Sequence, residues 1–227
     1  MNPHNPIRIL SVDDHYVVHE GIATIVNDQP DMRLVSQAFT AAEAIQQYRA
    51  VKPDITLMDL RLPDHSGIEV MLQIRAEFPD ARIIMLTMFA GDVEIQRALQ
   101  AGARGYLLKN MPPRQMVEAI RQVHAGNKRV PPEVASHLAE HLTDQPLSIR
   151  EVEILRYLSQ GNRNRQIAKK LFVSEDTVKA HVKHIMKKLG AKDRTHAVVL
   201  AERRGIIRLN SDGFPSTPAV TNLATGA

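Results

Sequence analysis

The sequence contains no cysteine. Disulfide bonds and thiolate metal sites are therefore excluded. No apolar run approaches the roughly 18 residues that a membrane-spanning helix needs. The first ten residues, MNPHNPIRIL, also lack the basic start and apolar core of a secretory signal. We therefore expect a soluble, cytoplasmic protein that does not contact a membrane.

The charge of the chain is uneven, although its net value is only +4. Residues 1–126 carry 12 Lys and Arg against 15 Asp and Glu, a net charge of −3. Residues 147–209 carry 15 Lys and Arg against 6 Asp and Glu, a net charge of +9. This asymmetry indicates an acidic front unit and a basic rear unit with an anionic partner, although a solvated lysine surface would give the same count.

The front half alternates short apolar runs with amphipathic stretches. Strands alternating with helices favour a parallel sheet covered on both faces. We therefore predict an α/β fold with a five-stranded parallel sheet, followed by a small all-α domain. The predicted strands are 7–12, 32–38, 54–59, 82–87 and 105–109, and the predicted helices cover roughly 16–27, 41–50, 67–78, 92–101 and 112–124.

Breaker residues separate the two halves. The stretch AGNKRVPPEVASHLAEHLTDQP surrounds a short helical pattern with glycine and proline, and from Leu147 onward the pattern is helical. The end, SDGFPSTPAVTNLATGA, is small and polar. We expect a front domain over 6–126, a linker with a short helix over 127–146, a helical domain over 147–209 and a disordered tail over 210–227.

Five polar residues stand at the ends of the predicted strands. Asp13 and Asp14 follow the first strand, and Asp59, Thr87 and Lys109 end the third, fourth and fifth. The carboxyl ends of parallel strands lie at one edge of the sheet, where α/β proteins bind ligands. Carboxylates suit Mg²⁺, which would relieve the repulsion between neighbouring acids. An Asp beside Mg²⁺ and Lys could accept a phosphoryl group, because both cations would hold the product.

Each of these residues has an ordinary structural explanation when it stands alone. Two acids after a strand often cap a helix, Thr87 could bond within its own loop, and Lys109 could be a surface charge. The coincidence of all five at strand ends favours a functional site.

The front half resembles the receiver domain of response regulators over about residues 7–124. The motifs that carry the resemblance are VDDH, LMDLRLPDHSGIEV, IIMLT and GARGYLLK. The resemblance implies a flavodoxin-like, doubly wound fold in which Asp59 accepts a phosphoryl group. It also implies a Mg²⁺ site at Asp59, with Asp14 as a direct ligand, Asp13 acting through water and the backbone carbonyl of Arg61 as a further ligand.

The same resemblance implies roles for three more residues. Thr87 and Lys109 would hold the phosphoryl oxygens, and Tyr106 would be an aromatic switch that turns inward as Thr87 moves. A tyrosine that simply packs on the sheet edge is the plainer explanation of that position. His19 stands where relatives often have Arg, and we expect it to be a surface side chain.

The basic half predicts three helices that form a helix-turn-helix. Gly161 ends the first helix, and Ser174 can cap the third, whose first turn is acidic. The predicted buried stripe of the third helix is Val178, Val182, Ile185 and Leu189. The opposite face carries Lys179, Ala180, Lys183 and Lys187. A basic helix after a short helix and a tight turn is typical of major-groove binding, whereas a solvated lysine face is the alternative.

Residues 147–207 resemble the LuxR/FixJ-type DNA-binding domain, and the order of the two domains is that of NarL/FixJ regulators. Arg163 stands where relatives usually cap the second helix with Ser or Thr, so we expect Asn162 or Asn164 to cap it. The resemblance implies base contacts from Lys179, Ala180 and Lys183, and nearby phosphates for Thr177, Lys187, Arg194 and Thr195.

Three functions are weighed. The first is a two-component response regulator: a sensor histidine kinase phosphorylates Asp59, and the chain binds double-stranded DNA as a homodimer without being a turnover enzyme. The second is an aspartyl-phosphate phosphatase, which needs an acid two residues after the nucleophile, where this chain has Arg61. The third is a constitutive DNA-binding protein whose receiver only dimerises, which the complete set of acidic and phosphate-binding residues argues against. We predict the first.

Overall fold

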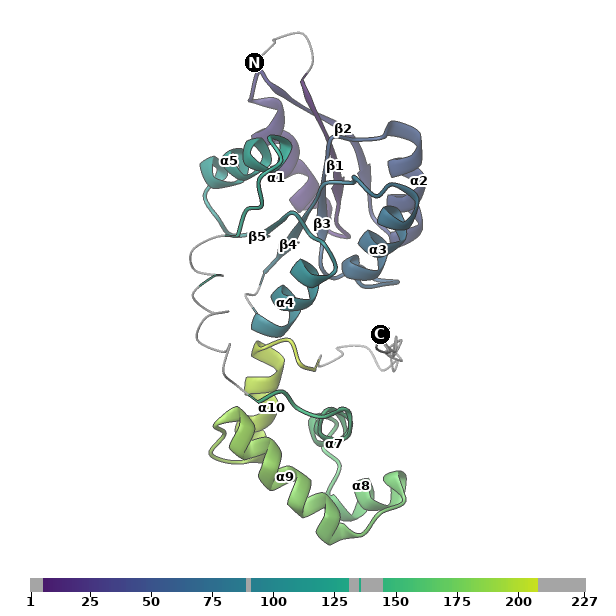
Figure 1. Ribbon diagram of the computed structural model, residues 1–227, viewed down its shortest axis with the longest axis vertical. Helices are drawn as coiled ribbons and strands as arrows, with labels where there is room; N and C mark the ends of the chain where they lie inside the picture. The colour runs from purple at the N-terminus through teal and green to yellow at the C-terminus, as the bar shows by residue number, and fades with distance from the viewer. Residues whose placement is uncertain (1–5, 89–90, 131–134, 136–144, 208–227) are drawn as a thin grey trace, which may run out of the picture. The chain divides into compact units, whose positions relative to one another are not determined.

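The computed structural model describes residues 6–88, 91–130, 135 and 145–207. Most of the predicted linker and the whole predicted tail lie outside these residues. The chain forms two compact units, one built mainly of residues before Leu147 and the other mainly of residues from Leu147 onward (Figure 1). Among the described residues, no helix has both the length and the apolar character needed to cross a bilayer.

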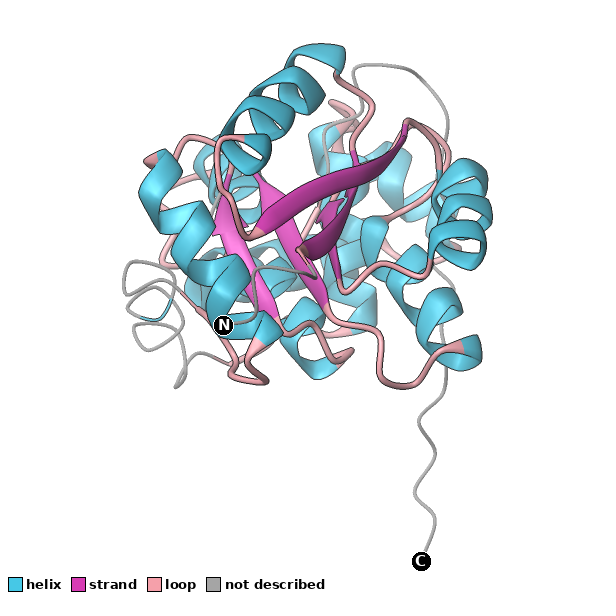
Figure 2. Cartoon of the chain, turned by 90° about the horizontal axis from the view of Figure 1, so that it is seen from above, coloured by secondary structure: helices cyan, strands magenta, loops and turns pink. Residues whose placement is uncertain are grey.

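The first unit is a five-stranded parallel sheet with the strand order β2-β1-β3-β4-β5, which confirms the predicted α/β class. Figure 2 shows helices on both sides of this sheet. The strands are β1 (Ile7–Val12), β2 (Met32–Ala38), β3 (Ile55–Asp59), β4 (Ile83–Thr87) and β5 (Gly105–Leu108). The helices are α1 (Tyr16–Asn27), α2 (Ala41–Val51), α3 (Gly67–Glu77), α4 (Asp92–Gln100) and α5 (Pro113–His124).

The sheet separates two apolar layers, because successive side chains of a strand point to opposite faces. In β3, Met58 belongs to the layer that contains α2, α3 and α4, whereas Leu57 belongs to the layer that contains α1 and α5. Both side chains are fully buried. Burial on both faces explains why the strands read as continuous apolar runs rather than as alternating ones.

The second unit is wholly helical where it is described. Its helices are α7 (Ile149–Ser159), α8 (Asn164–Leu171), α9 (Glu175–Leu189) and α10 (Arg194–Arg203). The predicted stripe of α9 is confirmed in part: Val178 and Ile185 are fully buried, while Val182 and Leu189 are half-buried. Ser174 caps α9 as predicted, because its hydroxyl accepts from the backbone N–H of Thr177.

The predicted cap of α8 is wrong. Neither Asn162 nor Asn164 caps this helix: Arg163 is the N-cap residue, and its backbone N–H donates to the side-chain oxygen of Gln166 at 2.7 Å. Asn162 instead donates its side-chain amide to the carbonyl of Tyr157. A glutamine at the third helical position thus satisfies a backbone donor that the arginine side chain cannot.

Glu151 links two helices of the second unit. It completes a capping box with Ser148 at the start of α7, and its Oε2 atom lies 2.7 Å from Nζ of Lys188 near the end of α9. Burial alone raises the pKa of Glu151, but the hydrogen bonds from Lys188 and Ser148 outweigh it and hold the pKa below its usual value.

Replacing Glu151 by Gln should destabilise this unit by about 1–3 kcal/mol at neutral pH, because the charge-assisted hydrogen bond between Glu151 and Lys188 is lost. A lowered carboxyl pKa stabilises the fold above the ordinary Glu pKa, and this stability is lost as pH falls through the lowered value. Wild type should therefore lose stability in acid more steeply than Glu151→Gln. Hydrogen exchange of α9 amides in the full chain measures both effects.

Glu153→Gln is the matched control, because Glu153 is half-exposed and its ion pair lies within α7, with Arg150. Equal losses in the two variants would contradict the role assigned to Glu151.

Candidate functional site

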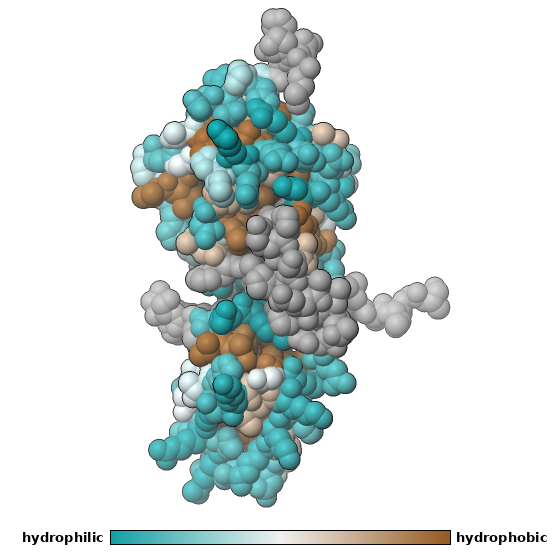
Figure 3. All heavy atoms as spheres, turned by 90° about the vertical axis from the view of Figure 1, so that its left-hand side faces the viewer, coloured by the Kyte–Doolittle hydropathy of each residue, from teal (hydrophilic) through white to brown (hydrophobic). Residues whose placement is uncertain are grey.

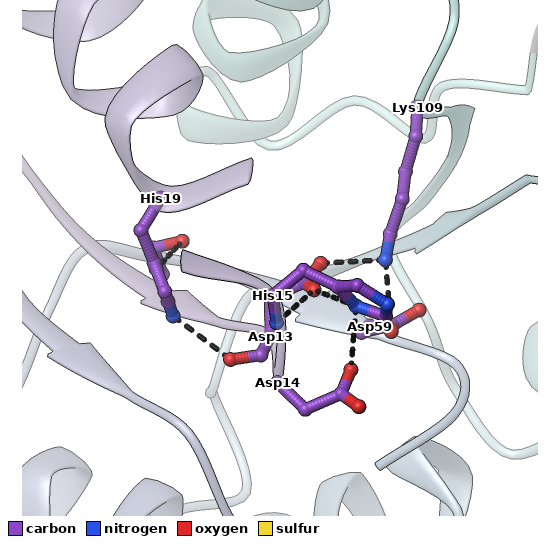
Figure 4. A network of polar contacts seen from close by, with 7 residues as sticks. Asp13, Asp14, His15, His19, Asp59 and Lys109 are labelled. Carbon is purple, nitrogen blue, oxygen red and sulfur yellow. Dashed lines mark hydrogen bonds and ion pairs between the residues drawn. The ribbon is translucent and has the colours of Figure 1, made fainter. Parts of the chain in front are cut away.

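Asp13 directly follows β1, Asp59 ends the adjacent strand β3, and both carboxylates face the same ammonium group. Nζ of Lys109, which follows β5, lies 2.6 Å from Oδ2 of Asp13 and 2.9 Å from Oδ2 of Asp59 (Figure 4). All three side chains are more than nine-tenths buried. The parallel sheet therefore brings these three predicted site residues together, although they are far apart in the sequence.

The ion pairs shift the ionisation of this cluster. Burial by itself lowers the pKa of Lys109, but hydrogen bonds and charge from Asp13 and Asp59 outweigh it and raise this pKa. Lys109 is thus held as an ammonium. Burial raises the pKa of Asp59, and this effect exceeds the opposing one of Lys109. Two buried carboxylates that share a single ammonium group would be stabilised by a further positive charge.

Asp14 and His15 lie beside Asp13 and add two further potential metal ligands to the site. Nδ1 of His15 lies 3.1 Å from Oδ1 of Asp13 and 2.8 Å from Oδ1 of Asp14. One potential ligand atom from each of Asp13, Asp14, His15 and Asp59 lies within 4.8 Å of the others. These groups could hold a small divalent cation, with the oxygen ligands that Mg²⁺ prefers.

A small cavity of about 110 Å³ opens beside the carboxylate of Asp59. Thr87 is buried at the end of β4, and its carbonyl accepts from the backbone N–H of Lys109 at 2.7 Å. The cavity is lined by His15, Asp59, Arg61, Thr87, Met88 and Lys109. Four of the predicted site residues therefore surround one space that adjoins the acidic cluster.

Gly67 fixes the loop that follows Asp59. A Cβ atom at this position would lie 1.9 Å from the backbone oxygen of Asp59, so only glycine allows this close approach. The backbone N–H of Gly67 donates to the carbonyl of Leu60 at 3.0 Å. Sequence reasoning gave this residue no role, although it lies within the motif that carries the receiver resemblance.

Tyr106 is fully buried in the layer that contains α4. Burial chiefly raises the pKa of its hydroxyl, the negative charge of Glu94 adds to the effect, and the neighbouring Thr87 side chain opposes it. Glu94 is itself buried on α4 and forms a long ion pair with Arg61, at 3.9 Å. The predicted switch residue thus points inward, toward Thr87 and a buried acid that sequence reasoning missed.

The prediction that His19 is a surface side chain is wrong. His19 is fully buried, with Nδ1 2.9 Å from Oγ of Ser11 and Nε2 2.8 Å from the carbonyl oxygen of Asp13. Its buried neighbours on α1, Ile22 and Val26, lie three and seven residues further on. This helical spacing is the signal that could have identified a buried position.

The basic face of α9 is exposed as predicted. Lys179 makes ion pairs with Asp176 at 3.0 Å and with Glu175 at 3.9 Å, which raise its pKa. In the view of Figure 3, the lower unit presents mainly hydrophilic side chains. The exposed predicted residues of α9 are Thr177, Lys179, Ala180, Lys183 and Lys187. A helix face of this kind can enter a major groove.

The two predicted residues of α10 differ in their surroundings. Thr195 is exposed, whereas Arg194 is half-buried and donates to the carbonyl of Asn162 at 2.8 Å. Arg194 therefore also ties the start of α10 to the turn before α8.

Two family models match this chain, in the order that the two units follow. Residues 9–121 match the response regulator receiver domain, and residues 145–201 match the bacterial regulatory proteins of the luxR family. The chain belongs to the response regulators of NarL/FixJ type, which join a receiver domain to a LuxR-type helix-turn-helix.

Relatives with the same arrangement extend over nearly the whole chain. The oxygen regulatory protein NreC of Staphylococcus carnosus is 37% identical over 215 residues, which are 88% of this chain and 99% of NreC. The crystal structure of ChrA, a response regulator of a heme-sensing two-component system, is 35% identical with a TM-score of 0.54 and covers 89% of this chain and 100% of its own. A structure of RcsB dimers bound to DNA is 26% identical with a TM-score of 0.68 and covers 88% of this chain and 99% of its own.

Proposed function

We propose that this transcription regulator is switched by phosphorylation of Asp59 and then binds double-stranded DNA as a homodimer. The observation that carries the proposal is the convergence of Asp13, Asp59 and Lys109 within hydrogen-bond distance beside a cavity that Thr87 also lines. A sensor histidine kinase would supply the phosphoryl group. The chain would act in the cytoplasm and would not turn over a separate substrate.

The charges of the site fit a Mg²⁺ ion. Three carboxylates and one ammonium leave a net charge of about −2, which a divalent cation would balance, and the ligand atoms are close enough to share one ion. We propose Asp14 as a direct ligand, Asp13 as a ligand through water, and Asp59 and the backbone carbonyl of Arg61 as further ligands. When bound, the ion would neutralise charge on the phosphoryl oxygens.

The chain's own residues account for the transfer step. A carboxylate oxygen of Asp59 attacks phosphorus, an O–P bond forms, and the N–P bond of the donor phosphohistidine breaks. The departing imidazole keeps the electron pair and takes a proton from solvent. Lys109, which stays charged, and Thr87 bind oxygens of the transferred group.

The acyl phosphate would then favour one of two arrangements of the Thr87 and Tyr106 side chains. Thr87 binds a phosphoryl oxygen, and the hydroxyl of Tyr106 follows it inward on the α4 side of the sheet. The buried position of Tyr106 supports this inward arrangement as an accessible state. Phosphorylation needs to shift the balance of the two states by only a few kcal/mol to change the response.

The output is DNA binding through α9. Lys179, Ala180 and Lys183 would contact base edges, while Thr177, Lys187, Arg194 and Thr195 would lie near phosphates. The exposed basic face supports this assignment. Dimerisation is supported by RcsB, which binds DNA as dimers, and would place two copies of α9 on two half-sites.

Treatment with a small phosphodonor tests the proposal directly. Mg²⁺ should allow one phosphoryl group per chain to be incorporated, and an excess of EDTA should reduce the rate at least tenfold, because the carboxylates then lack their counter-charge. Intact-mass spectrometry measures the added phosphoryl group. Equal incorporation in Mg²⁺ and in EDTA, or labelling at a residue other than Asp59, would contradict the proposal.

A further inference from the structure

We propose that His19 is a positioning residue for the metal-binding turn: its imidazole fixes the peptide group between Asp13 and Asp14, so that both carboxylates face one ion. This role rests on the Mg²⁺ site of the proposed function and deepens it. His19 belongs to α1, whereas the acids belong to the turn after β1 (Figure 4).

The contact with Asp13 has a defined direction. A carbonyl oxygen can only accept, so Nε2 of His19 carries the hydrogen and donates to the oxygen of Asp13 at 2.8 Å. Both partners are fully buried, so no water competes for this hydrogen bond. A buried carbonyl without a hydrogen-bond donor would lower the stability of the fold. The imidazole of His19 supplies this donor to the carbonyl of Asp13.

The backbone of Asp13 is held on both sides of its Cα atom. Its N–H donates to the carbonyl of Ala38 on β2 at 3.0 Å, which orients the preceding peptide plane. Its C=O accepts from His19, which orients the following plane. Because peptide groups are planar, fixing both planes fixes φ and ψ of Asp13 and the direction in which the chain enters Asp14. The direction of the Cα–Cβ bond of Asp13 and the position at which Asp14 begins follow from this geometry.

His19 is itself held in place. Its Nδ1 atom lies 2.9 Å from Oγ of the buried Ser11, and its ring meets the edge of Phe39 with centroids 4.5 Å apart. Hydrogen bonds and packing therefore hold one ring orientation. Outer partners of this kind typically contribute about 10- to 100-fold to metal affinity.

Two substitutions distinguish the contributions of the two ring nitrogens of His19. His19→Gln keeps an amide near the position of Nε2 and can still donate to Asp13, whereas His19→Asn keeps one near Nδ1 and reaches only toward Ser11. We expect His19→Asn to weaken Mg²⁺ binding about tenfold and His19→Gln to weaken it less than about threefold. Titration calorimetry of the full chain with MgCl₂ measures this, independently of phosphorylation.

A stability control distinguishes positioning from general packing. Ile22→Val removes a buried methyl group of the same helix from the apolar layer shared with α5, so it should lower the melting temperature and leave Mg²⁺ affinity unchanged. Equal Mg²⁺ affinity in wild type and both His19 variants would overturn the positioning role of His19. A larger loss of Mg²⁺ affinity in His19→Gln than in His19→Asn would also overturn it. A wild-type chain that binds no Mg²⁺ would refute the proposed metal site and, with it, this role.

Discussion

Replacing Asp59 by Asn should abolish the response of DNA binding to a phosphodonor. The variant lacks the carboxylate that we propose as the phosphoryl acceptor, and an amide is too weak a nucleophile to replace it. Wild type should gain about 5- to 150-fold in DNA affinity on phosphorylation, which is the usual range of coupling between two sites. Asp59→Asn should gain nothing. Fluorescence anisotropy with a duplex selected from random fragments, with and without phosphodonor and Mg²⁺, measures the gain.

Asp80→Asn is the matched control, because Asp80 is an exposed acid of the same unit, outside the cluster at the carboxyl ends of the strands. It should respond as wild type does. If Asp59→Asn still gained affinity in the presence of the phosphodonor, Asp59 would not be the acceptor. If wild type and Asp59→Asn bound equally tightly under every condition, the constitutive DNA-binding alternative would be the better description.

Replacing Lys183 by Ala should weaken specific DNA binding by about 1–3 kcal/mol, or about 5- to 150-fold, because the ammonium that we propose to contact base edges is lost. Lys187→Ala should instead weaken binding to all duplexes alike and reduce the slope of log affinity against log salt by about one, as expected when one phosphate contact is lost. Salt titrations on the selected duplex and on a scrambled one separate the two effects.

Lys128→Ala controls for the loss of one positive charge, since Lys128 is an exposed lysine of the first unit. It should leave both the specific affinity and the salt slope close to those of wild type. An unchanged preference for the selected duplex in Lys183→Ala would show that this side chain does not read bases and that α9 docks in another orientation.

The sheet and the acidic cluster could be predicted from the sequence because each depends on residue types in a repeating order. Strands alternating with helices specify a parallel sheet, and a parallel sheet places Asp13, Asp59, Thr87 and Lys109 at one edge whatever the loops do. The basic face of α9 could be predicted for the same reason, since helical periodicity alone separates lysines from the buried stripe.

The errors concern contacts between side chains and backbone. The prediction that His19 lies at the surface came from its position, where relatives often have Arg, yet its partner is the backbone carbonyl of Asp13, which residue types do not reveal. The prediction for α8 considered only side chains that could cap the helix as acceptors in place of Arg163. It therefore missed Gln166, whose side-chain oxygen accepts from the backbone N–H of Arg163. Every residue carries the same backbone groups, so only the folded geometry shows which of them a side chain will satisfy.

The separation of the two apolar layers limits how far a signal at Asp59 can spread. Tyr106 and α4 share one layer, and α1 and α5 share the other. In the proposed switch, a movement of Tyr106 would repack the layer that contains α4 and leave the layer that contains α1 and α5 unchanged. Apolar substitutions beneath α1 and α5 would then affect stability alone, whereas those around Tyr106 would also alter the balance between the two proposed signalling states.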